Sequence, residues 1–393
     1  MTVLYLADTR FPLERANGAQ TMATCRALAA RGHDVTLVVR PDTAPVPRDP
    51  HAFYGGTRPD RLTIRTIPAP RDARLRRMRF LVEAGAIASR WPGVILTRDL
   101  GLAAFLLQVP LTRRARVVYE SHGVADVVSA EMPRLLGRPE LAPSAAKLRR
   151  LSRREARVWR HAAAYVTITA ALAAELESRF GARAHVHVVA DGGPDADALG
   201  LPSYDPARRP VVVAYAGHLY PWKGVDVLIR ALAAVPDVQG LIVGGHPAEA
   251  DRARVEQLAG SLGLASRITF TGHLPPSEVA PRLAAASMLV LPNTASAISE
   301  RYTSPLKLFE YLAMGRPIVA SDLPAIREVL TDDQSALLVR PGDPADLASA
   351  IGRLATDPAL AGRLAAGAAT LAPRYTWAVR AERLEAALED AAA

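Results

Sequence analysis

A lysine and a carboxylate fall within the first two turns of one predicted helix, in the segment YTSPLKLFEYLAMGRPIVASD at 302–322. Ser304 is expected to be the N-cap of this helix and Pro305 its first residue. Lys307 and Glu310 follow on the next turns. The unpaired N–H groups and the dipole of a helix start favour an anion. A nucleotide diphosphate would fit this position.

Two predicted strands flank the helix and place its start. SMLVLP at 287–292 precedes a polar loop, and PIVAS at 317–321 follows Gly315, which suits the left-handed position that closes a helix. Strand, loop, helix and strand form a βαβ unit. Its loop opens at the carboxyl edge of a parallel sheet, where ligands bind in such folds.

A second strand end supplies another lysine. In AGHLYPWKGVDVLI at 216–229, a predicted strand ends and Lys223 stands just before Gly224 and the next helix. An ammonium group here would face the 304 helix across the same sheet edge. It could hold a diphosphate and neutralise its charge as it leaves. A solvated surface lysine is the alternative for this residue taken alone.

The chain has 393 residues, which exceeds the size at which one core keeps growing, so we expect two domains. Strand-like and helix-like segments alternate, stop at a Gly-, Pro- and Asp-rich stretch at 191–210, and then start again. The predicted fold class is α/β, with two Rossmann-like, doubly wound parallel-sheet domains. The expected parts are an N-terminal domain at 1–200, a C-terminal domain at 201–375, and a final helix at 376–393 that could pack back towards the first domain.

Three segments carry a resemblance to a known family. YAGHLYPWKGVDVLI, FTGHLPPSEV and TSPLKLFEYLAMGRPIVASD, in this order and spacing, resemble the C-terminal domain of the retaining glycosyltransferases of family 4, also called glycosyl transferases group 1. That family has the GT-B fold of two Rossmann-like domains with a cleft between them. The resemblance covers essentially the whole chain, specifically in the second half and loosely in the first. It implies a sugar donor bound mainly by the C-terminal domain and an acceptor bound mainly by the N-terminal domain.

The resemblance also assigns residues to the donor site. It implies that Glu310 holds the ribose hydroxyls of the donor and that Lys223 holds its diphosphate. Backbone N–H groups around Thr303 and Ser304 would complete the phosphate cradle. The other residues expected to contact the donor are Gly217, His218 and Lys307.

Two positions depart from the family pattern. The family has two Glu separated by seven residues, but Tyr302 stands where the first would be, and Glu300 is two positions too early. His218 stands where an Arg is frequent, so one permanent positive charge is absent there. Which residue takes the place of the first Glu stays open.

Two strand ends of the first half could contact substrates. Gly18 lies close to a helix start in TRFPLERANGAQT at 9–21 and resembles the family's glycine loop, with a plain turn as the alternative. VVYESHGV at 117–124 ends a strand at Glu120 and His122. His122 resembles the histidine that these enzymes place near the sugar, with a structural hydrogen-bonding role as the alternative.

We expect no cofactor and no metal. No GxGxxG follows the first strand, no GxxxxGK[ST] is present, and no His/Cys cluster has metal spacing. Asp195 and Asp197 mimic the Asp-x-Asp metal clamp of the other glycosyltransferase fold, but they lie in the apparent linker. A lone Cys25 and the absence of a secretory signal or a long apolar run favour a cytoplasmic protein.

The net charge of +9 is concentrated in the first half, in RDARLRRMR at 71–79 and KLRRLSRREARVWR at 147–160. The second segment puts six arginines on one helical face: Arg149, Arg150, Arg153, Arg154, Arg157 and Arg160. A solvated face is one interpretation, and peripheral attachment to an anionic membrane at its inner face is the other. No recognition motif accompanies the charge, which argues against nucleic acid.

The sequence therefore predicts a metal-independent, retaining glycosyltransferase of the hexosyltransferase type. Its donor would be a nucleotide diphosphate sugar, UDP-linked in most such families. Its acceptor would be an alcohol on a small natural product, a polysaccharide or a lipid carrier. The resemblance implies front-face attack, with the leaving diphosphate able to take the proton of the acceptor. A non-hydrolysing sugar-nucleotide epimerase of the same architecture and a non-catalytic sugar-nucleotide-binding protein remain alternatives.

Overall fold

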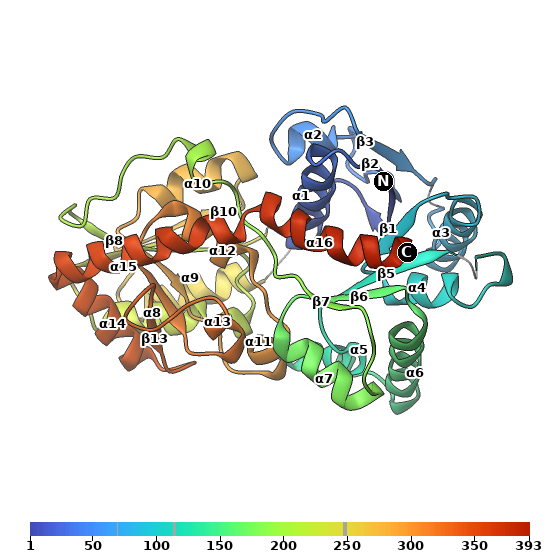
Figure 1. The fold of residues 1–393 in the computed structure, drawn as a ribbon. Helices are drawn as coiled ribbons and strands as arrows, with labels where there is room; N and C mark the ends of the chain where they lie inside the picture. Colours follow the sequence, from blue (N-terminus) through green and yellow to red (C-terminus); the bar gives the residue numbers. More distant parts are fainter. Residues whose placement is uncertain (69, 113–114, 247–249) are drawn as a thin grey trace. The chain divides into compact units, whose positions relative to one another are not determined.

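The structure, a computed structural model, describes residues 1–68, 70–112, 115–246 and 250–393. It divides the chain into two compact units (Figure 1). Unit 1 comprises Met1–Ala130, Pro143–Gly192 and Trp377–Ala393, and unit 2 comprises Glu131–Ala142 and Gly193–Thr376. Each unit is built on one parallel sheet, so the predicted α/β class with two Rossmann-like domains is confirmed.

The sheet of unit 1 has seven strands in the order β3-β2-β1-β4-β5-β6-β7. Its strands are β1 (Thr2–Arg10), β2 (Asp34–Arg40), β3 (Leu62–Thr66), β4 (Val94–Thr97), β5 (Arg116–Ser121), β6 (Ala164–Thr167) and β7 (Val186–Val188). The central strands are almost fully buried apolar runs, because helices cover both faces. The order reverses between β1 and β4, which places a ligand crevice at their carboxyl ends.

The helices of unit 1 form two layers. They are α1 (Ala16–Ala30), α2 (Pro50–Phe53), α3 (Ala73–Ala88), α4 (Leu100–Leu106), α6 (Ala145–His161), α7 (Ala170–Phe180) and α16 (Trp377–Ala392), with α5 (Ala125–Leu135) beginning in this unit. The C-terminal helix α16 packs against α1 and against β5, β6 and β7. Because crossovers are right-handed, α3, α4, α6 and α7 lie on the opposite face of the sheet.

The sheet of unit 2 has six strands in the order β10-β9-β8-β11-β12-β13. They are β8 (Val211–Ala216), β9 (Val238–Val243), β10 (Ile268–Gly272), β11 (Met288–Leu291), β12 (Ile318–Ser321) and β13 (Leu337–Val339). The helices are α8 (Val225–Ala233), α9 (Asp251–Ser261), α10 (Pro276–Ala284), α11 (Ala297–Arg301), α12 (Leu306–Met314), α13 (Pro324–Arg327), α14 (Pro344–Thr356) and α15 (Pro358–Leu371). The order reverses between β8 and β11, so their carboxyl ends form the switch point of this unit.

The start of α12 differs from its prediction by one residue. Pro305 has φ −76° and ψ 121°, so it is still extended and the helix begins at Leu306. Ser304 therefore precedes the cap position and is not the N-cap. The predicted end is confirmed, because Gly315 adopts the left-handed conformation with φ 60° and ψ 36°. The loop before α12 also contains a short helix, α11, that the sequence did not indicate.

Candidate active site

Glycines allow the loops at the switch point of unit 2 to approach one another closely. Gly217 follows β8 with φ +132°, and a Cβ there would lie 2.9 Å from Nζ of Lys307. Gly244 follows β9 with φ +128°, and a Cβ there would lie 2.1 Å from the carbonyl oxygen of Gly217. The lysine of α12 can reach the end of β8 because Gly217 carries no side chain, and the loops after β8 and β9 can approach because Gly244 carries none.

The loop that carries Lys223 is fixed against the end of β11. Its 3-10 turn, Pro221–Lys223, ends at Gly224 with φ +72°. A Cβ on Gly224 would lie 1.7 Å from the carbonyl oxygen of Pro292, so only glycine fits. The N–H of Thr294 also donates to the carbonyl oxygen of Trp222 at 3.1 Å.

Lys223 itself is half-buried and poised to change its charge. Its Nζ lies 3.5 Å from the centroid of the Trp222 ring, within range of a cation–π contact. Burial lowers the pKa of Lys223 to about 7, because the charged form loses hydration there. An anion bound beside Nζ would restore the ordinary preference for the charged form.

Lys307 lies close enough to both Lys223 and Glu310 to be affected by their charges. Nζ of Lys307 donates to Oη of Tyr215 at 2.8 Å, and that hydroxyl donates to the carbonyl oxygen of His218 at 2.6 Å. Burial holds the pKa of Lys307 well below its usual value, Lys223 lowers it further, and Glu310 opposes both. Burial raises the pKa of Glu310, against the attraction of Lys307. The structure thus brings together three of the predicted donor-site residues.

The remaining predicted residues of this edge have structural contacts of their own. The hydroxyl of Thr303 donates to the carbonyl oxygen of Ile298 at 2.7 Å and so fastens the loop to α11. Ser304 is half-buried two residues before the first residue of α12. The ring of His218 stacks on that of Tyr220, with centroids 5.0 Å apart. A phosphate contact through the backbone at 303 and 304 stays a prediction.

The position of the family's first Glu is part of the core here. Tyr302 has an exposed fraction of 3%, so its ring packs inside unit 2. Glu300 is half-buried on α11, two residues earlier.

Two polar groups of this edge were missed by the sequence reasoning. Nε1 of Trp222 and Oδ1 of Asn293 are buried and have no hydrogen-bond partner among the described residues. Such groups are rare in native proteins and commonly bind a water or a ligand. Asn293 follows the segment 287–292 predicted as a strand, and this placement at a strand end was the available signal.

In unit 1, His122 is attached to a buried carboxylate. One oxygen of Glu120, Oε1, lies 2.6 Å from Nε2 of His122 and accepts bonds from Gln20 at 2.6 Å and from Arg380 at 2.8 Å. Burial raises the pKa of Glu120, but Arg380 and His122 outweigh it and hold that pKa well below its usual range. Burial and Arg98 lower the pKa of His122, which Glu120 partly opposes. The arrangement holds a neutral imidazole in a fixed orientation near pH 7.

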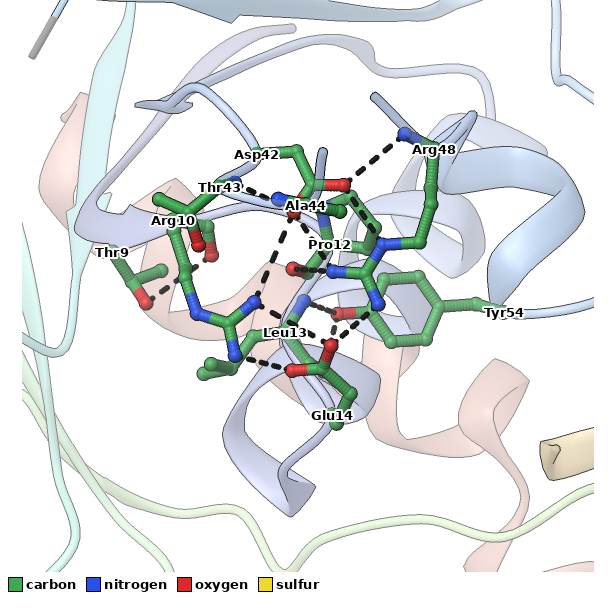
Figure 2. A network of polar contacts seen from close by, with 10 residues as sticks. All are labelled: Thr9, Arg10, Pro12, Leu13, Glu14, Asp42, Thr43, Ala44, Arg48 and Tyr54. Carbon is green, nitrogen blue, oxygen red and sulfur yellow. Dashed lines mark hydrogen bonds and ion pairs between the residues drawn. The ribbon is translucent and has the colours of Figure 1, made fainter. Parts of the chain in front are cut away.

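Gly18 lies inside the first turn of α1 instead of in the loop before it. A Cβ there would lie 2.2 Å from Oη of Tyr54 and 2.5 Å from the carbonyl oxygen of Leu13, so close packing already requires a glycine. Figure 2 shows Tyr54 accepting from the N–H of Leu13 at 2.7 Å and donating to its carbonyl oxygen at 2.8 Å.

Ion pairs stabilise the same loop (Figure 2). Arg48 bonds to Asp42 at 2.8 Å and also to Glu14, which Arg10 contacts at 2.5 Å. Burial raises the pKa of Glu14, but its bonds to the two arginines outweigh burial and lower that pKa to about 2. These contacts hold the loop after β1 in place at the carboxyl edge of the unit 1 sheet.

Comparisons with known proteins agree with this architecture. Residues 210–357 match the sequence model described as glycosyl transferases group 1, and residues 17–192 match that of the glycosyl transferase 4-like domain. The two parallel-sheet domains have the GT-B fold, and both matched models describe glycosyltransferase domains. The chain belongs to the group 1 glycosyltransferases of family 4 type, as the resemblance predicted.

Curated relatives match over part of their length. A D-inositol 3-phosphate glycosyltransferase of Stackebrandtia nassauensis is 35% identical over 203 residues, which are 49% of this chain and 43% of that protein. An alpha-D-kanosaminyltransferase of Streptomyces kanamyceticus is 30% identical over 181 residues, 45% of this chain and 44% of that protein. The match thus spans less than half of either relative.

Solved structures resemble the whole chain in fold. Sucrose-phosphate synthase from Thermosynechococcus elongatus has a TM-score of 0.76 at 21% identity and covers 98% of both chains. HepE of Anabaena in complex with UDP-glucose has a TM-score of 0.75 at 18% identity and covers 99% of both chains. At these identities the likeness shows the fold.

Proposed function

We propose that this protein transfers a sugar from a UDP-linked donor to a hydroxyl group of an acceptor, with retention of configuration and without a metal ion. The observation that carries the proposal is the cluster of Lys223, Lys307 and Glu310 at the switch point of unit 2. Two lysines beside one carboxylate and a helix start suit a ligand with two negative charges next to a hydroxylated ring. HepE, which shares the fold, was solved with UDP-glucose.

The donor site can assist bond cleavage through its charges. As the bond between the sugar and the diphosphate breaks, negative charge grows on the leaving oxygens. Lys223 and Lys307 stabilise that charge, and more strongly in the transition state than in the ground state. Glu310 would accept hydrogen bonds from the ribose and fix the nucleotide in register. The leaving oxygen then takes the proton of an acceptor hydroxyl that attacks from the same face of the sugar.

The two lysines also carry the argument for a metal-independent site. They supply the positive charge that a divalent ion would otherwise bring to a diphosphate. Asp195 and Asp197 are both exposed, and Oδ1 of Asp195 accepts the N–H of Asp197 at 3.1 Å within a short turn.

Cys25 is a buried free thiol, in keeping with a reducing cytoplasm as the place of reaction.

His122 belongs to the acceptor side in this proposal. It lies just after β5, at the carboxyl edge of the unit 1 sheet, and Glu120 fixes the orientation of its ring. Because Nε2–H of the neutral imidazole donates to Glu120, Nδ1 can accept a hydrogen bond from a sugar hydroxyl without adding charge.

A screen of nucleotide sugars tests the proposal. The protein is incubated with UDP-, dTDP- and GDP-linked sugars, and thermal shift and release of free nucleoside diphosphate are measured. A bound donor raises the melting temperature by mass action, and slow hydrolysis releases UDP. The proposal fails if no nucleotide sugar shifts the melting temperature. It also fails if the sugar is epimerised while still attached to the nucleotide, which nuclear magnetic resonance would detect.

A further inference from the structure

Helix α3 in unit 1 exposes a stripe of large apolar side chains. Leu75, Met78 and Val82 have exposed fractions of 57%, 61% and 65%. Their spacing puts them on one face of the helix, and together with Pro70 they line one shallow hollow. The inner face of the same helix is separately buried, with Phe80 fully enclosed. The stripe is therefore additional to the apolar surface that the fold needs.

Arginines surround this stripe. Arg71, two residues before α3, and Arg74, in its first turn, are exposed and have no ion pair among the described residues. Arg79 is exposed beside Met78 and pairs with Glu83 at 2.6 Å. A helix with an apolar face flanked by basic side chains has the composition of an interfacial membrane helix.

A second basic helix lies in the same layer of unit 1. Helix α4 contacts both α3 and α6, so it lies between them, as Figure 1 also shows. Helix α6 carries seven Lys or Arg residues and one Glu, and that Glu155 is buried. Its six arginines are exposed and form no ion pair among the described residues: Arg149, Arg150, Arg153, Arg154, Arg157 and Arg160. The layer thus joins an apolar stripe to a wide positive field.

We propose that α3 docks this protein on the surface of an anionic lipid bilayer. Leu75, Met78 and Val82 enter the interface, Arg71 and Arg74 contact lipid phosphates, and α6 adds longer-range attraction. Nucleic acid would engage the arginines and leave the apolar stripe in water. A bilayer satisfies both, because it offers phosphates above hydrocarbon within one helix diameter. The inference goes beyond sugar transfer and uses no residue of the donor site.

Vesicle sedimentation tests the docking surface. Vesicles of phosphatidylcholine alone are compared with vesicles that also contain phosphatidylglycerol, at low and at high salt. The protein is expected to sediment with the anionic vesicles at low salt and to be released in part at high salt. Met78→Asp together with Val82→Asp should weaken binding at least tenfold. Val46→Asp is the matched control, because Val46 is 77% exposed outside α3, and it should bind like the parent.

A fluorescence measurement separates insertion from simple adsorption. Relative to the parent, Met78→Trp should add emission that shifts to the blue on anionic vesicles, and the emission added by Val46→Trp should not shift. The proposal is overturned if the parent does not sediment with anionic vesicles at low salt, or if Met78→Asp with Val82→Asp binds as well as the parent. It is also overturned if Val46→Asp loses binding equally. Conversion of a dimer into a monomer by the α3 variant would show instead that the stripe contacts a second copy of the chain.

Discussion

Binding of a nucleoside diphosphate should draw protons from solution onto the lysines of unit 2. Burial lowers the pKa of Lys223 to about 7 and holds that of Lys307 well below its usual value. A diphosphate beside these groups favours their charged forms and raises both pKa values. Because the bound protein holds more protons than the free protein, the affinity for UDP should fall as the pH rises above 7.

The size of the effect follows from the pKa of Lys223. At pH 8, a group with a pKa of about 7 is roughly 90% neutral, so binding should add about one proton at Lys223 and up to one more at Lys307. Each proton taken up lowers the affinity about tenfold per unit of pH in this range. UDP is fully ionised at pH 8, since the last phosphate proton has a pKa of about 6, so the ligand takes up none.

Isothermal titration at pH 8 in HEPES and in Tris measures the number of protons, because the two buffers differ in ionisation enthalpy. The difference in heat should correspond to at least one proton taken up. Lys223→Met should lower the uptake by about one, and Lys147→Met, a change at an exposed lysine of α6, should leave it unchanged. Equal heats in both buffers would show that the lysines are already charged, and the reasoning would be wrong.

Three further predictions concern single groups. Glu310→Ala should weaken UDP binding by tens-fold, since a hydrogen bond to a charged group contributes about 1.5–3 kcal/mol; unchanged affinity in a folded variant would contradict the role of Glu310. Transfer should persist in excess EDTA, and complete loss restored by Mg²⁺ or Mn²⁺ would make Asp195 and Asp197 candidates again. Burial raises the pKa of Glu155 to about 8, so its neutral form is native and stability is lost as the pH rises from about 4.5 towards 8. Glu155→Gln should therefore lose less melting temperature between pH 6 and pH 8 than the parent, and an equal loss would refute the shift.

The sequence predicted the elements whose signals are local. The apolar run at 287–292 predicted the strand before α12, and Gly315 predicted the end of the helix. The structure confirms both. The helix start was wrong by one residue because proline fixes φ but leaves ψ free, and Pro305 is extended. The sequence did not predict β7 and β13, because each has three residues, which is too short to show the alternation of apolar and polar side chains typical of a strand.

Contacts between distant segments lay beyond the sequence. Arg380 bonds to Glu120 across 260 residues, and no local pattern marks an arginine in a C-terminal helix as the partner of a strand carboxylate. Lys307 and Tyr215, 92 residues apart, are a second case. The site residues could be identified from their positions at strand ends. The effect of their charges on one another's pKa could not be predicted, because it depends on how distant segments of the chain pack together.

No described helix has the length and apolar character that a membrane crossing requires. The docking proposed for α3 rests on one exposed face of that helix, and it can be tested without reference to the donor site.

The central claim is that the start of α12, with the loop that carries Lys223, binds a nucleoside diphosphate. A crystal structure of the protein with UDP tests it most directly. We expect phosphate oxygens within hydrogen-bond distance of Nζ of Lys223 and Nζ of Lys307, and ribose hydroxyls that donate to the carboxylate of Glu310. A nucleotide bound at another edge of unit 2, or one whose ribose lies away from Glu310, would contradict the claim.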